Sequence, residues 1–409
     1  MNKYKIINDP IYGFIRLNDP LLFDLLEHPL VQRLREIRQL GMSYLVYPGA
    51  THSRLAHALG AMHLMQQVML ILRDKGVDIP HATGTSACAA ILLHDIGHGP
   101  FSHALEHLIG GPVNHEFWTR AMMEHLNELS GGALTEAISI FEGTHPMPFL
   151  HQLVSSQLDV DRLDYLNRDS FFTGVSEGIV GWDRIIQMMH VFRGELVVEE
   201  KGIYSVEKFL LARRLMYWQV YQHKTVLSAE FLMRSIVERA RELLASGETL
   251  EGSDALLMLL KQTEAVNPKE HPYILSAYAE TDDHDFLAAV KKWSRKGDRV
   301  LLTLCAQLQN RKLYRVVLSA EKPGPERINQ IQHQICAAYG ISAQESLYFF
   351  RTGSIVNHAL RTDREPIYIL GKDHSVKEIT EASQNPHLKA LTGVVEKYVI
   401  YALKEFLGY

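Results

Sequence analysis

The sequence predicts a mainly α fold with a smaller α+β part at its C-terminal end. From about residue 20 to 190, apolar residues recur mostly at intervals of three and four, as one buried face of a helix requires. Beyond about residue 245, helical patterns alternate with short strand-like runs. We therefore expect a helical core domain over residues 1–245. Residues 246–409 are expected to form an α+β region that serves oligomerisation or regulation.

The N-terminal part contains two segments with clear local patterns. Residues 3–17 alternate well enough to predict a short hairpin that turns near residue 9. Residues 85–96 predict a buried helix, because small and aliphatic side chains occupy every face. The glycines and the proline that follow should end this helix, and a further helix is expected to carry His103.

The middle of the chain predicts one long helix over residues 205–245. Four of its side chains fall close to one stripe, namely Arg213, Tyr217, Tyr221 and Lys224. The polar stretch 245–254 predicts a linker, and strands are expected at 313–319 and 366–371.

Composition narrows the class of protein. The 409 residues include 42 basic and 47 acidic side chains, a net charge of −5, and no long basic run, so nucleic-acid binding is disfavoured. The three cysteines lie far apart without CxxC spacing, which is typical of a reducing compartment. No signal-peptide core and no membrane-length apolar stretch is evident, so we expect a cytoplasmic enzyme or binding protein without a membrane partner.

The strongest chemical signal is a pair of adjacent residues, His94 and Asp95, within LLHDIGHGPFSH. His57 lies upstream in SRLAHALG, and Asp161 lies downstream in LDVDRLDYLNRD. Two imidazoles and two carboxylates suit one divalent metal: Mn, Fe, Co, Ni, Zn or Mg. An isolated His-Asp doublet is more often a hydrogen-bonded pair. This doublet ends an apolar helix, where buried charge needs a partner, and metal binding is the better interpretation.

Further residues near these motifs suit phosphate chemistry. His98, His103 and His115 follow the doublet closely and have the pKa range for proton transfer. Glu106 either orients His103 or is a solvated helix residue. The remaining candidates are Tyr165 and Asp169, which share a helical face with Asp161, and Arg54 and Arg213, whose guanidinium groups suit phosphate. Each has a plainer alternative, as part of a polar stripe or as a surface charge.

Six stretches of this sequence together resemble the HD-domain phosphohydrolases: NDPIYGFIRL, QRLREIRQLG, YPGATHSRLAHALG, LLHDIGHGPFSH, LDVDRLDYLNRD and RRLMYWQVYQHK. They run over roughly residues 5–225. The similarity is closest to the deoxynucleoside triphosphate triphosphohydrolases, in particular those whose vertebrate members carry an additional sterile alpha motif domain. This resemblance implies an HD-domain helical core.

The resemblance also assigns roles. It implies that His57, His94, Asp95 and Asp161 bind the metal, and that His103 and His115 assist catalysis, with Glu106 in place of the family's usual aspartate. It places these residues against the substrate: Gln39, Leu40, Arg54, Tyr165, Asp169, Arg213, Tyr217 and Tyr221. Tyr221 matches the aromatic residue that excludes a ribose 2′-hydroxyl. The implied reaction releases intact triphosphate from a dNTP.

Family relatives are often dimers or tetramers with nucleotide activator sites between subunits, so a homo-oligomer is expected. The positions that match an activator site are Lys5, Asn8, Gln32, Arg35, Lys201, Arg311 and Arg315. Glu27 replaces the family's base-reading aspartate, and Glu199 replaces a basic phosphate contact.

Two other functions stay open at this point. One is a phosphohydrolase of the same class that acts on nucleoside mono- or diphosphates, cyclic nucleotides or a guanosine alarmone. The other is a nucleotide-binding regulator that retains the site but turns over slowly.

Overall fold

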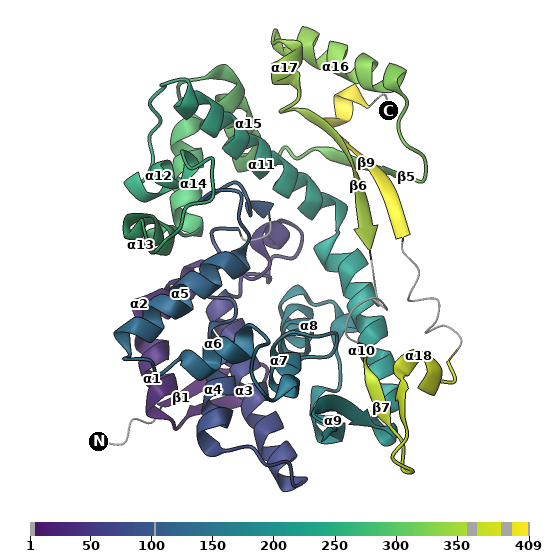
Figure 1. Ribbon diagram of the computed structural model, residues 1–409. Coiled ribbons are helices and arrows are strands. Elements are labelled where there is room, and N and C mark those ends of the chain that lie inside the picture. Colours follow the sequence, from purple (N-terminus) through teal and green to yellow (C-terminus); the bar gives the residue numbers. More distant parts are fainter. Residues whose placement is uncertain (1–4, 102–103, 358–365, 386–394, 408–409) are drawn as a thin grey trace.

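The computed structural model is mainly helical, as the sequence predicts (Figure 1). It describes residues 5–101, 104–357, 366–385 and 395–407. The chain forms two lobes that share one continuous apolar core, and α11 runs between them (Figure 1).

The predicted N-terminal hairpin is confirmed. Strands β1 (Lys5–Asp9) and β2 (Gly13–Leu17) pair antiparallel, with Asn8 opposite Phe14. The turn forms because Asp9 Oδ1 accepts hydrogen bonds from the backbone of Ile11 and Tyr12, at 2.9 and 3.1 Å.

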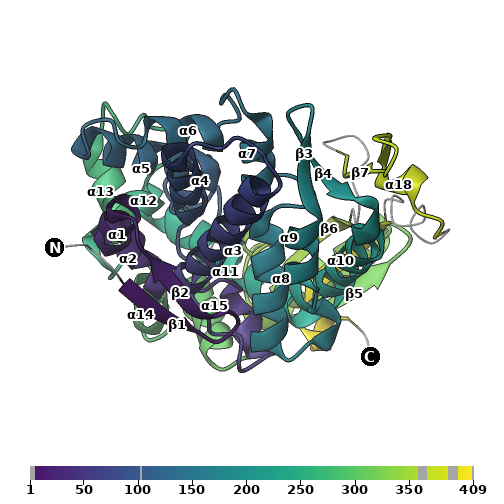
Figure 2. The ribbon, with the colours of Figure 1, turned by 90° about the horizontal axis from the view of Figure 1, so that it is seen from below.

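Nine helices follow among the described residues of the first lobe. They are α1 (Pro20–Glu27), α2 (Pro29–Gln32), α3 (Arg54–Asp74), α4 (His81–Leu93), α5 (His115–Leu129), α6 (Thr135–Phe141), α7 (Pro148–Val154), α8 (Val160–Thr173) and α9 (Trp182–Met188). Helix α3 runs through the middle of this lobe (Figure 2). By length and composition α3 could cross a membrane, but 67% of its most apolar window is buried, as expected of a core helix.

The single helix predicted over residues 205–245 is wrong. Strands β3 (Met189–Phe192) and β4 (Glu195–Glu199) lead into α10 (Ile203–Met216), which passes into a π-helical turn, η6 (Tyr217–Tyr221). The chain then extends at His223, whose Nδ1 caps the first turn of α11 (Lys224–Ala245). Apolar periodicity cannot register such a widened turn, since it adds a residue without removing the helical pattern.

The C-terminal region contains helices and strands, as predicted. Its elements are α12 (Asp254–Leu260), α13 (Pro272–Glu280), α14 (Asp283–Trp293), α15 (Arg299–Gln309), β5 (Arg315–Ser319), α16 (Pro325–Tyr339), α17 (Ala343–Ser346), β6 (Phe350–Asn357), β7 (Tyr368–Leu370), β8 (Val376–Glu378), α18 (Ile379–Ala382) and β9 (Val395–Ala402). The strands predicted at 313–319 and 366–371 correspond to β5 and β7.

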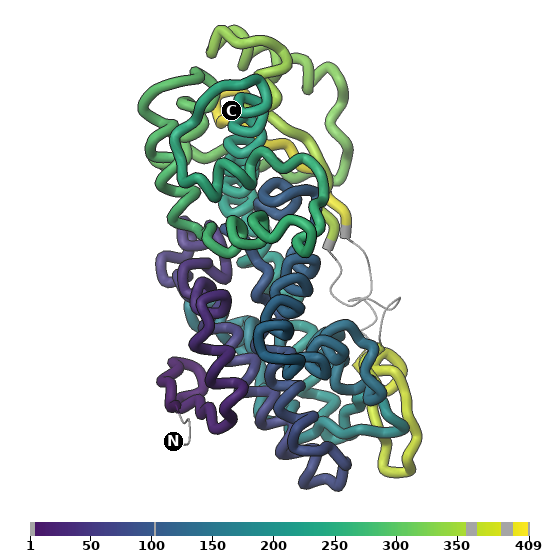
Figure 3. Tube along the Cα trace, turned by 60° about the vertical axis from the view of Figure 1, so that its left-hand side comes forward, coloured from purple at the N-terminus to yellow at the C-terminus, as the bar shows by residue number. Residues whose placement is uncertain are grey.

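Two sheets organise this region. Strands β5, β9 and β6 form an antiparallel sheet beside α11, whereas β7 returns to the first lobe and pairs parallel with β4 (Figures 1 and 3). The predicted linker is a short connection between α11 and α12, and the apolar core continues across it. The boundary at residue 245 stays a prediction.

Candidate metal centre

Three helices bring the predicted ligands together from distant parts of the sequence. His57 lies in the first turns of α3, His94 caps the end of α4, and Asp161 lies in the first turn of α8. One ligand atom from each lies within 4.8 Å of the others. Asp161 Oδ1 is 3.1 Å from His57 Nε2 and 3.5 Å from His94 Nε2, so one cation can contact all three side chains.

The hydrogen bonds around the two imidazoles leave the inward nitrogens available. His57 Nδ1 lies 2.7 Å from Asp164 Oδ2, and His94 Nδ1 lies 2.7 Å from the carbonyl oxygen of Ile91. Because an ionised carboxylate and a carbonyl can only accept, both Nδ1 atoms must carry the proton. In the neutral form that a metal ligand requires, each ring then turns a lone pair on Nε2 inward. Both Nε2 atoms are buried without a hydrogen-bond partner among the described residues, as metal-ligating nitrogens would be.

The sequence reasoning missed Asp164, which supports the metal centre from α8. Its carboxylate is fully buried and also accepts from Arg168 Nε and Nη2, at 2.9 and 3.0 Å. The close packing of α8 on α3 requires a glycine, because a Cβ at Gly60 would lie 2.0 Å from Asp164 Oδ1. The signal was present in the sequence, since Asp164 and Arg168 are four residues apart on one helix.

Asp95 lies at the edge of the cluster. The expectation that His94 and Asp95 are both helical is wrong, because α4 ends at Leu93 and the doublet forms its cap and the following turn. Asp95 Oδ1 is 3.4 Å from His94 Nε2, and its Oδ2 accepts from Arg54 Nη1 at 2.5 Å. Asp95 therefore faces the centre while Arg54, predicted to grip phosphate, holds it in place.

The electrostatics of the centre favour a cation. Burial lowers the pKa of His57, but the carboxylates of Asp161 and Asp164 outweigh burial and raise this pKa to about 10. Burial raises the pKa of Asp161, yet its contacts with the two imidazoles hold it far below its usual range. The carboxylates thus stay ionised and attract positive charge, which either protons or a metal ion can supply.

A second group of side chains adjoins the centre. His98 Nε2 lies 3.3 Å from Asp95 Oδ1, and the His98 ring stacks on His115 with centroids 3.9 Å apart. Glu106 Oε1 accepts a hydrogen bond from the backbone N–H of His115 at 2.7 Å and lies 2.6 Å from Nδ1 of the same histidine. Burial and the nearby Arg54 cation hold the pKa of His98 well below its usual value. Glu106 thus orients His115, while the predicted His103 lies outside the described residues.

The substrate-contact candidates on α8, α10 and η6 gather beside the centre. The Arg213 Nε and Nη1 atoms are buried without a hydrogen-bond partner among the described residues. Tyr221 lies edge-on to Tyr165, with centroids 6.1 Å apart, and to Tyr217, with centroids 5.2 Å apart. The three tyrosine rings thus pack edge to face near the Arg213 guanidinium group.

Asp169 is engaged by the protein itself. Its two carboxylate oxygens contact His52 Nε2 and the Tyr221 hydroxyl, each at 2.8 Å. His52, which the sequence reasoning missed, is buried. Its carbonyl oxygen accepts a hydrogen bond from the Gln39 backbone N–H at 3.0 Å. Gln39 and Leu40, the predicted sugar contacts, lie just before the 3₁₀ turn η2 (Gly41–Leu45). Gln39 is linked to Asp169 through His52, which contacts both residues.

Several matched activator positions pair within this chain. Lys5 forms an ion pair with Glu27, and Arg35 donates to Gln32 at 2.7 Å. Glu199 pairs with Lys75 at 2.6 Å. The other positions lie on separate elements, namely Asn8 on β1, Lys201 in the turn before α10, Arg311 after α15 and Arg315 on β5. The nucleotide activator stays a prediction.

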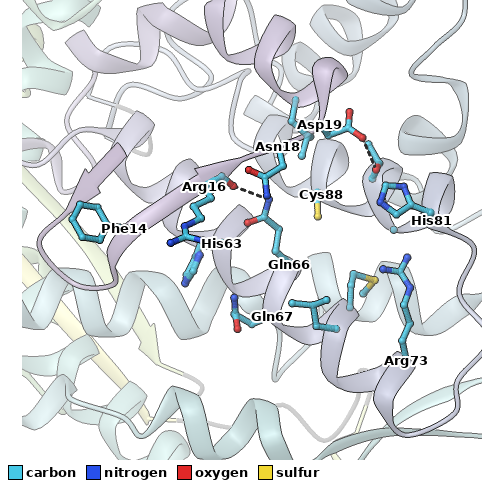
Figure 4. A pocket seen from close by; sticks show the side chains of 15 residues that line it. Phe14, Arg16, Asn18, Asp19, His63, Gln66, Gln67, Arg73, His81 and Cys88 are labelled. Atoms are coloured by element: carbon cyan, nitrogen blue, oxygen red, sulfur yellow. Dashed lines mark hydrogen bonds between the residues drawn. The ribbon is translucent and has the colours of Figure 1, made fainter. Parts of the chain in front are cut away.

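An open groove lies in the first lobe, away from the candidate metal centre. A groove of about 540 Å³ runs between β2, α3 and α4, with Arg16, His63, Arg73 and His81 among its lining residues (Figure 4). None of the candidate site residues lines this groove. The clustered ligands, rather than this groove, therefore locate the candidate metal centre.

Comparison with known proteins agrees with this geometry. Residues 54–169 match an HD domain, and residues 180–267 match an HD associated region. The chain is 46% identical to a phosphohydrolase from Bacteroides thetaiotaomicron of known structure, covering 98% of this chain and 100% of that one, with a TM-score of 0.94. The HD match contains His57, His94, Asp95 and Asp161.

Two relatives known by sequence are more distant. The chain is 28% identical to the uncharacterized protein YwfO of Bacillus subtilis, over 94% of this chain and 88% of that protein. It is 29% identical to the deoxynucleoside triphosphate triphosphohydrolase SAMHD1 homolog of Dictyostelium discoideum, over 64% of this chain and 55% of that protein.

Proposed function

Because the chain belongs to the HD-domain phosphohydrolase family, we propose that it is a metal-dependent nucleotide phosphohydrolase that releases triphosphate from dNTPs. The observation that carries the proposal is the pair of buried Nε2 atoms on His57 and His94, which face Asp161 without hydrogen-bond partners among the described residues. A buried polar atom without a partner is costly, and a metal ligand bond satisfies it.

The donor set fits a divalent ion with imidazole and carboxylate ligands. His57, His94 and Asp161 would hold it, with Asp95 at the edge of the cluster. When bound, such an ion polarises a phosphoryl oxygen and makes a water molecule more acidic. The mixed nitrogen and oxygen donors suit Mn, Fe, Co, Ni or Zn better than Mg, which prefers oxygen ligands.

The surrounding side chains suit a phosphorylated substrate. Arg213 has two buried N–H groups without acceptors among the described residues, and a phosphate would provide those acceptors. His115, oriented by Glu106, stacks on His98, and this pair of imidazoles supports a role in proton donation to a leaving oxygen. Arg54 keeps Asp95 ionised and turned toward the centre.

The choice of dNTPs rests on the tyrosines and on similarity. Tyr221 packs edge-on against Tyr165 and donates to Asp169, so its ring is fixed, as a residue that excludes a ribose 2′-hydroxyl would need to be. The Dictyostelium relative is a triphosphohydrolase by name and supports the same substrate. Homo-oligomerisation, a nucleotide activator and a cytoplasmic location belong to the same proposal, and the three free cysteines suit a reducing compartment.

The test is product identification. Protein loaded with Mn²⁺ is incubated with dNTPs, NTPs, nucleoside mono- and diphosphates and cyclic nucleotides, and the products are separated by anion exchange. We expect deoxynucleoside and triphosphate from dNTPs, abolished by Asp161→Ala and unaffected by the matched change Asp183→Ala at an exposed position. Orthophosphate release alone, or cleavage of a cyclic substrate, would replace dNTPs with another nucleotide. Binding without turnover would make the protein a regulator.

A further inference from the structure

The loop that carries His98 is held by a part of the chain about 180 residues further on. We call residues 96–101 the His98 loop. The Tyr278 hydroxyl, near the end of α13, donates to the carbonyl oxygen of Gly97 at 3.0 Å. The backbone N–H of Phe101 donates to Asp283 Oδ1, in the first turn of α14, at 2.8 Å. The junction between α13 and α14 thus fixes both ends of the loop.

Arg33 ties the same two segments together. Its Nη1 donates to the carbonyl oxygen of Ile96 at 2.9 Å, and its Nε donates to that of Ala279 at 3.1 Å. Its guanidinium group also lies 5.7 Å from the centre of the Tyr278 ring. One side chain from the first lobe therefore joins the start of the His98 loop to the end of α13.

The two C-terminal side chains are buried and closely packed. Tyr278 is 5% exposed and stacks on Trp118 of α5, with centroids 4.1 Å apart, and Asp283 is 1% exposed. A Cβ at Gly99 would lie 2.8 Å from the Tyr278 hydroxyl oxygen, so the loop and this tyrosine meet at a glycine. Burying a carboxylate is costly unless it is hydrogen-bonded, and Asp283 accepts from backbone N–H groups of Phe101 and Arg38.

The position of His98 depends on the backbone that these contacts hold. His98 Nε2 lies 3.3 Å from Asp95 Oδ1, and its ring stacks on His115, so both contacts depend on where the backbone holds the ring. Tyr278 also lines a small cavity together with His98, Glu106 and His115. The hydroxyl that holds the loop is therefore next to the histidines that the proposed function uses.

We propose that the α13–α14 junction is a clamp that positions the His98 loop, with Tyr278 and Asp283 as its positioning residues. The clamp gives the C-terminal region a part in the chemistry of the first lobe. The catalytic importance of His98 rests on the proposed function. The clamp itself can be tested by hydrogen–deuterium exchange, which needs no substrate.

The experiment compares full-length variants by hydrogen–deuterium exchange and by steady-state kinetics. Tyr278→Phe removes one hydroxyl and keeps the ring that stacks on Trp118, and Tyr273→Phe, on the exposed face of the same helix, is the matched control. Asp283→Ala removes both acceptors, and Asp283→Asn restores one of them. In peptides that span residues 96–101, we expect exchange to quicken about tenfold in Tyr278→Phe and Asp283→Ala, with partial recovery in Asp283→Asn.

Steady-state kinetics distinguish a residue that positions the His98 loop from one that only stabilises the fold. With the nucleotide that the wild type hydrolyses fastest, kcat should fall about 10- to 100-fold in Tyr278→Phe, while KM and bound Mn²⁺ stay within about twofold. Unchanged exchange over residues 96–101, or faster exchange with unchanged kcat, would overturn the clamp. Uniformly faster exchange across the whole chain would also overturn it, because the contacts would then be general packing. If the wild type hydrolyses no nucleotide, the proposed function fails, and the exchange pattern decides the clamp alone.

Discussion

Replacing Asp164 with asparagine tests how the protein prepares His57 for a metal. The buried carboxylate has two tasks, because it accepts from His57 Nδ1 at 2.7 Å and from Arg168 Nε and Nη2 at 2.9 and 3.0 Å. An asparagine side chain offers a single acceptor oxygen and adds a donor. The amide can then donate to His57 Nδ1, which moves the imidazole proton to Nε2 and blocks the ligand nitrogen.

Both losses can be given a size. Loss of a carboxylate that orients a metal-binding histidine weakens metal affinity about 10- to 100-fold. Breaking a buried ion pair costs about 3–5 kcal/mol, and we expect about 3 kcal/mol here because Arg168 keeps its contact with Asp9. The assays are calorimetric titration with Mn²⁺ for affinity and urea unfolding for stability.

Asp9→Asn is the control that separates the two tasks. It weakens the other buried ion pair of Arg168, in which Nη1 lies 2.8 Å from Asp9 Oδ2, but leaves the contact between Asp164 and His57 intact. We expect it to reduce stability while Mn²⁺ affinity stays near the wild-type value. Equal Mn²⁺ affinity in Asp164→Asn, Asp9→Asn and the wild type would refute the assignment of the His57 proton.

Three further predictions concern substrate binding and pH. Arg213→Lys should lower kcat/KM for nucleotides about 10- to 100-fold, because an ammonium group cannot replace a buried fork that binds phosphate; an unchanged value would remove Arg213 from the site. Tyr221→Ala should admit ribonucleotides, measured as the ratio of kcat/KM for dNTP and NTP, and an unchanged ratio would exclude a sugar gate at this residue. Burial raises the pKa of Asp283 to about 6, so the folded state binds the proton more tightly than the unfolded state does. Stability should therefore rise as pH falls from 7 to 5, by about 1 kcal/mol relative to Asp283→Asn, and an equal response of both proteins in urea unfolding would contradict the shift.

The sequence alone predicted the residues that form the candidate metal centre. Each lies in a local motif of distinctive residue types, and the two imidazoles and the carboxylate of Asp161 do meet in space. The sequence shows Asp164 and Arg168 four residues apart, but it does not show that Asp164 contacts His57. Asp164 reaches His57 only because Gly60 lets α8 approach α3, and such close packing is a property of the tertiary structure.

Two other features show the same limit. Glu106 contacts His115, nine residues further on through a turn, and the sequence spacing gave no sign of this contact. The predicted contact with His103 lies outside the described residues. The break between α10 and α11 was also missed, because the π-helical turn at Tyr217–Tyr221 preserves the helical pattern of apolar residues. In both cases the local sequence is compatible with several paths of the backbone, and packing against α5 or α8 selects one of them.

The clamp that we propose in the C-terminal region had no signal in the sequence, which predicted oligomerisation or regulation for that region. Tyr278 and Asp283 are an ordinary tyrosine and aspartate near the ends of two helices, and their hydrogen bonds reach backbone groups rather than recognisable side chains. A backbone acceptor leaves no pattern in residue types, so only the folded chain reveals the contact.

Nucleotide hydrolysis by this protein should depend on an ion that His57, His94 and Asp161 hold. The most direct measurement titrates chelator-treated protein with Mn²⁺ and follows bound metal and nucleotide hydrolysis in the same samples. Hydrolysis should rise in step with tight metal binding in the wild type, and His94→Ala should lose both. Hydrolysis that persists in the chelator-treated protein, or Mn²⁺ binding that His94→Ala leaves intact, would contradict the account.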